Sequence, residues 1–255
     1  MITYKDASAV AKMRAAGRIV ANTLRLLGEN VAPGVSTQRL NDLADAYIRS
    51  QGATPSFLHY RGYPMSVCIS VNEEVVHGIP GKRKLCEGDI VSCDVGAIFE
   101  GYHGDAARTF MVGKVSANTQ RLIRVTKECF CKALEQCQRG RRVSDISRAV
   151  QSHAESCGYG VVRALVGHGI GRAMHEDPEV PNFVQRRGGD PRLQPGMTLA
   201  IEPMINMGTA EVDFKHPDGW TVTTSDKLPS AHYENTVLIT EGEPVILTLW
   251  EGEEL

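Results

Sequence analysis

Three features are missing from this sequence of 255 residues, and each absence excludes a class of protein. No stretch is apolar for long enough to span a membrane, and Lys5, Asp6, Lys12 and Arg14 precede any apolar run, which excludes a signal peptide. The formal net charge is only -2, so a general nucleic-acid or anionic-membrane binder is not indicated. The seven cysteines are odd in number and lack the paired C-x-x-C spacing of a zinc site, which indicates free thiols in the cytoplasm.

The residues that are present can build a large core. The chain is 42% hydrophobic and no low-complexity linker interrupts it, so we predict a single domain over residues 1–255. Apolar spacing, capping residues and turn residues predict an α+β chain, in which Gly28 stops the first helix. The expected helices cover residues 6–27, about 36–50, 117–138 and 144–157. The expected strands cover residues 67–71, 89–95, 104–111, 198–205, 220–223 and 233–239.

A weak internal repeat runs through this order of elements. Apolar or glycine character is kept when Gly34, Leu40, Leu43, Ala44, Ile48 and Gly52 are matched with Gly140, Ile146, Ala149, Val150, Ala154 and Gly158. In the same way, Leu85, Gly88 and Asp94 match Leu193, Gly196 and Glu202, and His-Gly-Ile occurs at both 77–79 and 168–170. We therefore predict two similar αβ halves, roughly 1–115 and 116–255, that pack about a pseudo-twofold axis and share a polar cleft.

Two acids in the middle of the chain are the first candidate site. Asp94 and Asp105 lie on strands joined by a tight turn near Glu100 and Gly101, and a two-residue hairpin would place them diagonally opposite on one face. Carboxylates held so close repel each other unless a proton or a cation lies between them. On its own the pair is explained more simply as a polar hairpin with two solvated acids, because Asp is common near turns.

The second half offers two further acids on strands, as the repeat requires. Glu202 in TLAIEPMI and Glu234 in AHYENTVLI are single acids in apolar or β-forming runs, where an unpaired carboxylate is costly. A solvated strand face is the alternative, and it suits Glu234 better than Glu202. His168, among the glycines of VGHGIGRAMH, adds a nitrogen donor. Four carboxylates and a neutral imidazole would balance two divalent cations, with a bridging hydroxide completing the site.

The ordered set of these five residues, with the contexts HGIP, GHGIGR and MHEDPEVPN, resembles the type I methionine aminopeptidases over essentially the whole chain. The resemblance implies the pita-bread fold, in which two pseudo-twofold halves surround a central antiparallel sheet. It implies that Asp94 chelates one metal, that His168 and Glu202 chelate the other, and that Asp105 and Glu234 bridge them. The ions would be Co, Mn, Fe or Zn, and Glu202 would also shuttle the proton of the attacking hydroxide.

The same resemblance implies roles for residues around the metals. His77 would contact the nitrogen of the scissile bond, and His175 would steady the developing oxyanion. A thioether packs well against aromatic rings and a thiol. The residues at the positions that line the pocket for the substrate's methionine side chain are Tyr60, Tyr63, Cys68, Met174 and Trp220.

Three further positions resemble a monovalent-cation site of the family. Two other positions depart from the family pattern. The carbonyls of Asn72 and Glu74, with Ser230, would form the cation site. His59 stands where relatives commonly carry Gly, and Met174 where several carry Phe, which leaves the pocket's rim and its inhibitor profile open. The short interval between His175 and Glu202 lacks the insertion of the type II enzymes.

The resemblance implies a cytoplasmic monomer that removes the initiator methionine from nascent polypeptides whose second residue is small, without a nucleic-acid or membrane partner. Two other interpretations stay open. An Xaa-Pro aminopeptidase or prolidase shares the ligand pattern but usually carries an additional N-terminal domain. A non-catalytic binding module of the same fold would typically lack one or more ligands. The physiological metal, the occupancy of the two sites and docking on the ribosome are left open by the sequence.

Overall fold

The computed structural model describes residues 1–185 and 189–255. Four α-helices lie where the apolar spacing predicts them: α1 (Ala7–Asn30), α2 (Thr37–Ser50), α3 (Ala117–Leu134) and α4 (Val143–Ser156). Asp6, Ser36 and Ser116 cap the first three, each accepting a hydrogen bond from the backbone N–H three residues later. No helix of the described residues is long and apolar enough to cross a membrane.

Two predicted helix ends are wrong. Helix α3 ends at Leu134, short of the predicted residue 138. Helix α1 continues past Gly28 to Asn30, so this glycine does not stop it. A Cβ atom on Gly28 would lie 2.6 Å from Cε1 of Phe110, which is closer than real Cβ contacts come. The glycine therefore permits close packing of the helix against the sheet.

Within the described residues, the main sheet has nine strands in the order β1-β4-β5-β14-β9-β7-β8, with β2 beside β4 and β15 beside β14. All of its neighbouring strands are antiparallel. The strands are β1 (Thr54–Pro55), β2 (Cys68–Val71), β4 (Ile90–Phe99), β5 (Tyr102–Met111), β7 (Val166–Gly169), β8 (Glu176–Pro181), β9 (Thr198–Ile201), β14 (Glu234–Leu238) and β15 (Val245–Ile246). A mixture of helices with a central antiparallel sheet confirms the predicted fold class.

Two three-stranded sheets, β13-β10-β6 and β11-β12-β3, accompany the main one. Their strands are β3 (Glu74–Val76), β6 (Gly160–Val161), β10 (Met204–Asn206), β11 (Val212–Asp213), β12 (Val222–Thr224) and β13 (Ser230–His232). The strand predicted over 198–205 is interrupted at Glu202 and Pro203. Its first part, β9, belongs to the main sheet and its second part, β10, to a small one.

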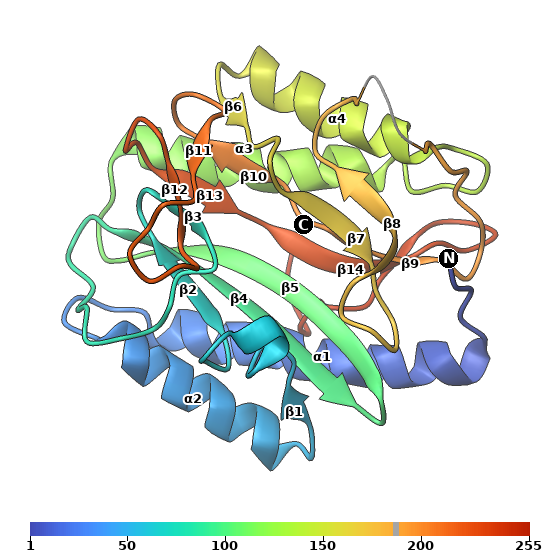
Figure 1. Ribbon diagram of the computed structural model, residues 1–255, viewed down its shortest axis with the longest axis horizontal. Coiled ribbons are helices and arrows are strands. Elements are labelled where there is room, and N and C mark those ends of the chain that lie inside the picture. The colour runs from blue at the N-terminus through green and yellow to red at the C-terminus, as the bar shows by residue number, and fades with distance from the viewer. Residues whose placement is uncertain (186–188) are drawn as a thin grey trace.

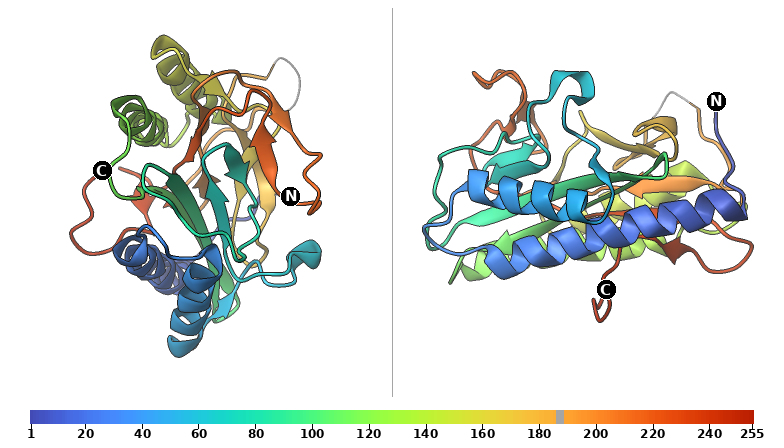
Figure 2. Two further views of the ribbon diagram at one scale, coloured as in Figure 1. Left: turned by 90° about the vertical axis from the view of Figure 1, so that its left-hand side faces the viewer. Right: turned by 90° about the horizontal axis from the view of Figure 1, so that it is seen from below.

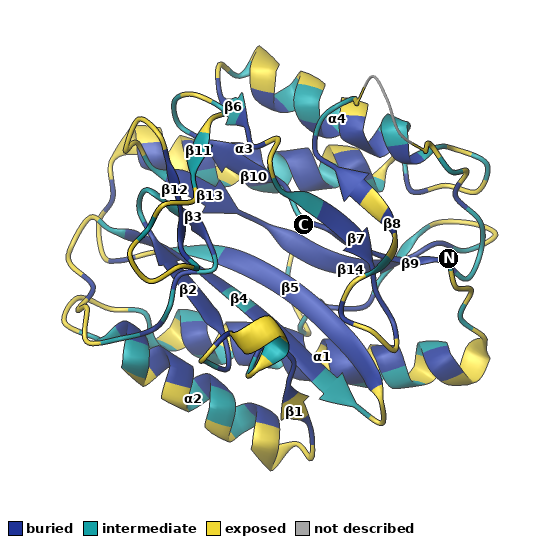
Figure 3. Cartoon of the chain, viewed as in Figure 1, coloured by how far each residue is buried: buried dark blue, intermediate teal, exposed yellow. Residues whose placement is uncertain are grey.

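The helices lie in two pairs on either side of the strands, α1 with α2 and α3 with α4 (Figure 1). One buried apolar cluster joins α1 and α2 to β4, and another joins α3 and α4 to β9 and β14. The middle of the sheet is almost entirely buried, whereas the outer faces of the helices are exposed (Figure 3). Seen from below, the short helix η1 (Tyr60–Gly62) rises on the side of the molecule opposite α1 and the C-terminal tail (Figure 2).

The central hairpin is confirmed, and its strands are longer than predicted. Its two turn residues, Glu100 and Gly101, have φ angles of 47° and 78°, as a two-residue hairpin turn whose twist matches the strands requires. The register pairs Gly96 with Asp105, so Asp94 and Asp105 are diagonal neighbours on one face.

The predicted repeat extends to backbone geometry. Gly34 N donates to Leu85 O at 2.7 Å in the first half, and Gly140 N donates to Leu193 O at 2.9 Å in the second. Four glycines of the repeat share φ angles between 86° and 94°, which only glycine adopts readily: Gly34, Gly88, Gly140 and Gly196. The single domain and the boundary between halves near residue 115 stay predictions.

A buried ion pair supports the central strands from the face opposite Asp105. Arg108 in β5 lies 2.6 Å from Glu253 of the C-terminal tail, and both side chains are almost fully buried. The guanidinium also donates to the carbonyl of Glu234 at 2.6 Å and to Oδ1 of Asn235 at 2.9 Å. Arg108 therefore ties the tail to β14, next to the strand residues that carry the candidate site.

We expect Glu253→Ala to lower the free energy of unfolding by about 3–5 kcal/mol, because the Arg108 charge stays buried without its carboxylate. Equilibrium urea unfolding measures this loss. Glu251→Ala is the matched control: it removes an exposed acid of the same tail and should change stability by less than about 0.5 kcal/mol. Equal effects of the two substitutions would contradict the structural role of the ion pair.

Candidate metal centre and active site

The strand register places three of the predicted ligands on one face of the main sheet. Asp94 in β4 and Glu234 in β14 both pair with Ala107 of the intervening strand β5, so the three side chains point to the same side. Asp105 lies two residues before Ala107 and shares its face. The alternative of solvated acids is wrong for Asp105 and Glu234, which are 3% and 2% exposed.

The remaining two predicted ligands reach the same face from the other half. His168 in β7 pairs with Ala200 of β9, and Ala200 pairs with Thr236 of β14. Thr236 lies two residues after Glu234 and therefore shares its face. Glu202 follows β9 directly, two residues after Ala200, and the carbonyl of Glu202 accepts a hydrogen bond from Asn182 at 3.0 Å.

His168 is oriented as a metal ligand would be. Its Nδ1 lies 2.8 Å from the carbonyl oxygen of Gly169, and since a carbonyl only accepts, Nδ1 carries the proton. The lone pair of Nε2 then faces the acids, at 3.6 Å from Glu202 Oε1 and 3.9 Å from Asp105 Oδ2. One ligand atom each from Asp105, His168 and Glu234 lie within 4.8 Å of one another.

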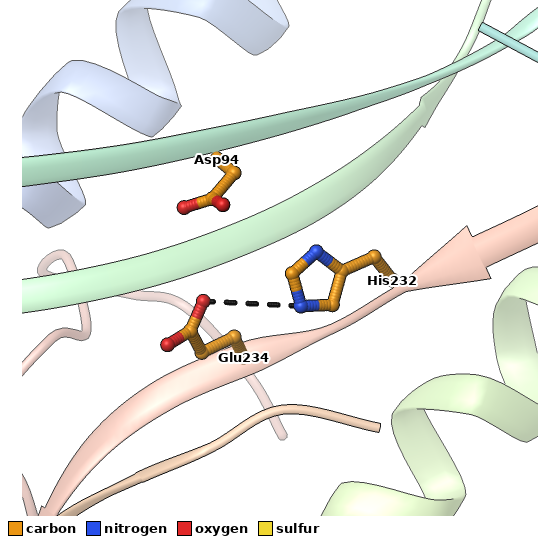
Figure 4. A group of neighbouring side chains, drawn as sticks. All are labelled: Asp94, His232 and Glu234. Carbon is orange, nitrogen blue, oxygen red and sulfur yellow. Dashed lines mark ion pairs between the residues drawn. The ribbon is translucent and has the colours of Figure 1, made fainter. Parts of the chain in front are cut away.

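A second group that also contains Glu234 includes a residue that the sequence analysis missed. Ligand atoms of Asp94, His232 and Glu234 also lie within 4.8 Å of one another, and Figure 4 shows the His232 ring facing the Glu234 carboxylate. The only signal was its position two residues before Glu234, because the predicted strand began at residue 233 and His232 ends the separate strand β13. Glu234 is thus common to two adjacent groups of potential ligands.

Burial and mutual repulsion favour protons on these acids when no cation is present. Burial raises the pKa of Asp94 to about 7. The pKa values of Asp105, Glu202 and Glu234 are raised well above the ordinary range, mainly by burial and then by the neighbouring carboxylates. Burial lowers the pKa of His168 to about 3, so its imidazole is neutral.

The residues present fit divalent cations. Asp94 Oδ1, Asp105 Oδ1, Glu234 Oε1 and His232 Nε2 are buried without a hydrogen-bond partner in the described part of the chain. A buried polar group left unpaired costs about 1–3 kcal/mol, so these atoms require a partner. Carboxylate oxygens with one or two imidazole nitrogens form a donor set that suits Mn, Fe, Co or Zn.

The two predicted catalytic histidines flank this centre. His175 stacks on Tyr60 with ring centroids 5.4 Å apart, and its Nδ1 lies 2.8 Å from the Tyr60 hydroxyl. The His168 and His175 ring centroids are 4.1 Å apart. His77 adopts a left-handed φ of 61°, and burial lowers its pKa to about 4. Both side chains border the cavity that also contains the five predicted ligands.

That cavity has a volume of about 290 Å³ and brings all the predicted pocket residues together. Tyr63 and Trp220 meet edge to face at 5.2 Å, and the Tyr63 hydroxyl donates to the carbonyl of Gly78 at 2.8 Å, which fixes the ring. Cys68 in β2 pairs directly with Asp94 in β4, so the pocket adjoins the candidate metal site. Burial raises the pKa of the Cys68 thiol well above its ordinary value, and the thiol stays neutral.

The two departures from the family pattern have visible places in the structure. His59 has a φ of 68°, in the left-handed region that favours glycine, and it directly precedes η1. Met174 is 2% exposed and packs in the same apolar cluster as Tyr63 and Cys68.

The predicted monovalent-cation site falls on adjoining loops and strands. Asn72 has a φ of 59°, and its carbonyl accepts a hydrogen bond from Ser230 N at 2.9 Å. Glu74 begins β3, which packs against β13, where Ser230 lies. The three residues are neighbours, and their role with a cation stays a prediction.

The stretch over residues 167–189 is rich in glycine and proline but contains regular strands. This stretch contains most of β7 and all of β8, which supply His168 and a wall of the site. Residues 186–188 of the stretch lie outside the described residues.

Comparison with known proteins agrees with this geometry. Residues 11–241 match the model of metallopeptidase family M24. A methionine aminopeptidase of Clostridium acetobutylicum is 53% identical over 252 residues, which span 98% of this chain and all of the relative. Methionine aminopeptidase 1 of Bacillus subtilis is 48% identical over 97% of this chain and 99% of the relative.

Solved structures agree with this result. They also distinguish relatives of the same family from proteins that share only the fold. The crystal structure of methionine aminopeptidase from Rickettsia prowazekii superposes with a TM-score of 0.95 at 43% identity, covering 98% of this chain and all of that chain. Prolidase from Pyrococcus furiosus superposes at 0.78 with 21% identity over 97% of this chain but only 66% of its own, and this likeness shows the shared fold alone. The chain belongs to metallopeptidase family M24, within its methionine aminopeptidases.

Proposed function

We propose that this enzyme removes the initiator methionine from nascent polypeptides whose second residue is small, using two divalent cations among Mn, Fe, Co and Zn. The observation that carries the proposal is the pairing of Cys68 with Asp94, which joins an apolar pocket to the carboxylate cluster. Neighbouring strands lie about 4.8 Å apart, so a substrate can fill the pocket with its first side chain while its main chain lies against the carboxylates.

The pocket chemistry supports methionine as the first residue of the substrate. A thioether gains about 0.3–1.5 kcal/mol from contact with an aromatic ring, and the pocket offers Tyr63 and Trp220 at right angles beside a neutral thiol. The positive amino group of a free N-terminus is attracted to the carboxylates at the inner end of the cavity.

The residues around the cations have distinct roles in hydrolysis. When bound, two divalent cations supply a water of lowered pKa and stabilise negative charge on the scissile carbonyl. Glu202, beside His168, would accept a proton from the attacking water and return it to the leaving nitrogen. Because the Tyr60 hydroxyl can donate to Nδ1 of His175, the proton of this ring is left on Nε2, where it can stabilise the oxyanion. Neutral His77 contacts the scissile nitrogen.

The cellular setting follows from this substrate. Nascent chains expose their first methionine in the cytoplasm, where we place the enzyme as a monomer, and docking on the ribosome would bring it to them. The monovalent-cation site at Asn72, Glu74 and Ser230 would brace the strands beside β12.

The metal centre can be tested by removal and replacement of the ions. We expect chelator-treated protein to bind two equivalents of Mn(II) or Co(II) in a calorimetric titration. At a metal concentration 100 times Kd, each bound ion should add about 2.7 kcal/mol of stability, or roughly 5–10 °C in Tm. Asp105→Ala should lose metal binding and turnover while keeping its fold, whereas Glu100→Ala in the same hairpin should keep both. Undiminished activity of Asp105→Ala would refute the dinuclear mechanism.

A peptide pair separates this proposal from an Xaa-Pro peptidase of the same fold. We expect the enzyme to release methionine from Met-Ala-Ser and to leave Ala-Pro-Ala intact, because an alanine side chain leaves the aromatic pocket unfilled. Chromatographic measurement of the free amino acid decides between them. The reverse preference would remove the methionine assignment, and cleavage of neither peptide by metal-loaded protein would favour a non-catalytic binding module.

A second peptide pair tests the limit on the second residue. Met-Gly starts should be cleaved roughly 5- to 150-fold faster than Met-Leu starts, because fitting a larger side chain into a packed site costs about 1–3 kcal/mol. Initial rates for two peptides that differ only at this position give the ratio. Similar rates would show that there is no steric filter.

A further inference from the structure

His232 is a buried histidine for which the proposed reaction has no role. It ends β13, and Thr109 fixes its backbone on both sides: His232 N donates to Thr109 Oγ1 at 2.9 Å, and Thr109 Oγ1 donates to His232 O at 2.9 Å. The residue is 2% exposed, and its Nε2 has no hydrogen-bond partner among residues 1–185 and 189–255. Since an unpaired buried nitrogen costs about 1–3 kcal/mol, the arrangement calls for a partner that the chain itself does not supply.

The surroundings of Nε2 identify the chemistry of that partner. The nitrogen lies 3.8 Å from Glu234 Oε2, which is too long for a hydrogen bond (Figure 4). Asp94 contributes a third atom, and all three lie within 4.8 Å of one another. Two atoms bound to the same ion at about 2.1 Å each can be at most about 4.2 Å apart. Small side-chain rotations therefore bring the three atoms to ligand distance around one cation.

The other half of the site shows the same combination of one imidazole with carboxylates. His168 presents Nε2 to Asp105 and Glu202, with Glu234 between the two groups. We propose that His232 Nε2 is a ligand of the divalent cation that Asp94 and Glu234 hold, so that each cation of the pair has one imidazole. The inference rests on the metal centre of the proposed function.

This ligand would change which ions the Asp94 position prefers. Carboxylates and water alone suit Mg, Ca and Mn, whereas an imidazole favours Fe, Co and Zn. His232 also lies outside the described residues that line the substrate cavity, so it acts on the cation from the inner wall, where the substrate does not reach.

The direct test is a crystal structure of the full-length protein loaded with zinc. The distance from His232 Nε2 to the zinc ion beside Asp94 should be about 2.1 Å. This measurement requires no substitution. A separation of about 4 Å, with a water molecule between the nitrogen and the ion, would overturn the proposal.

A series of variants tests the same ligand in solution. X-ray absorption at saturating zinc detects imidazole bound to the metal, and His168→Gln should retain this signal because His232 remains. Combining His168→Gln with His232→Gln should abolish the signal. Combining it with His103→Gln should not, since His103 is a buried histidine two residues before Asp105 whose Nδ1 already pairs with Ser56 Oγ at 2.9 Å. Loss of the imidazole signal in His168→Gln alone would refute a second imidazole ligand.

Calorimetry with zinc tests the role of His232 separately from the existence of the dinuclear centre. In His232→Gln, affinity for one of the two zinc ions should fall by more than the roughly 10- to 100-fold typical of losing an outer-shell partner. Unchanged affinity for both ions would overturn the role of His232 and leave the dinuclear centre intact. If the unaltered protein bound fewer than two zinc ions, the dinuclear centre of the proposed function would itself be wrong.

Discussion

The structure depends on the convergence of four carboxylates on one face of a sheet, where each repels the others. Two unit charges 4 Å apart interact by about 4 kcal/mol at the effective dielectric constant of a protein. Backbone hydrogen bonds fix Asp94, Asp105 and Glu234 in position, because the register of β4, β5 and β14 decides where their side chains point. The acids cannot separate without breaking the sheet, so they must bind protons or cations. The raised pKa values of the buried acids reflect the tendency to bind protons. The tendency to bind cations is the basis of the proposed function.

The predicted internal repeat accounts for the number of acids that one sheet brings to one point. In each half a glycine with positive φ precedes a strand that leads to a carboxylate, Gly88 before Asp94 and Gly196 before Glu202. The halves join where β5 pairs with β14, and these two strands carry Asp105 and Glu234. These are the two acids for which the bridging role is proposed. The copies also differ, since Pro203 interrupts the second strand and sends the chain into a separate small sheet.

Features set by local rules were predictable from the sequence. The turn at Glu100 and Gly101 defines the hairpin register, and the register defines the diagonal placement of the first two acids. His232 was missed because the predicted strand began only at residue 233, whereas His232 ends the separate strand β13 and belongs to no motif. By contrast, the ion pair of Arg108 with Glu253 joins residues far apart in the chain, and no local pattern indicates it. The close contact of Gly28 with Phe110 is also long-range and leaves no local pattern. The glycine was therefore wrongly predicted to stop the first helix.

The sheet positions the acids, whereas loops supply most of the pocket. The fold alone therefore does not decide the substrate. Prolidase from Pyrococcus furiosus shares this fold at 21% identity, and the sheet that positions the acids is part of that shared architecture. Unlike the acids, most pocket residues lie outside the main sheet. Tyr60 and Tyr63 come from η1 and the residue after it, and Trp220 precedes β12. Only Cys68 belongs to the main sheet, where it pairs with Asp94. Substrate choice can therefore change through the loops while Cys68 keeps any new pocket beside the Asp94 carboxylate.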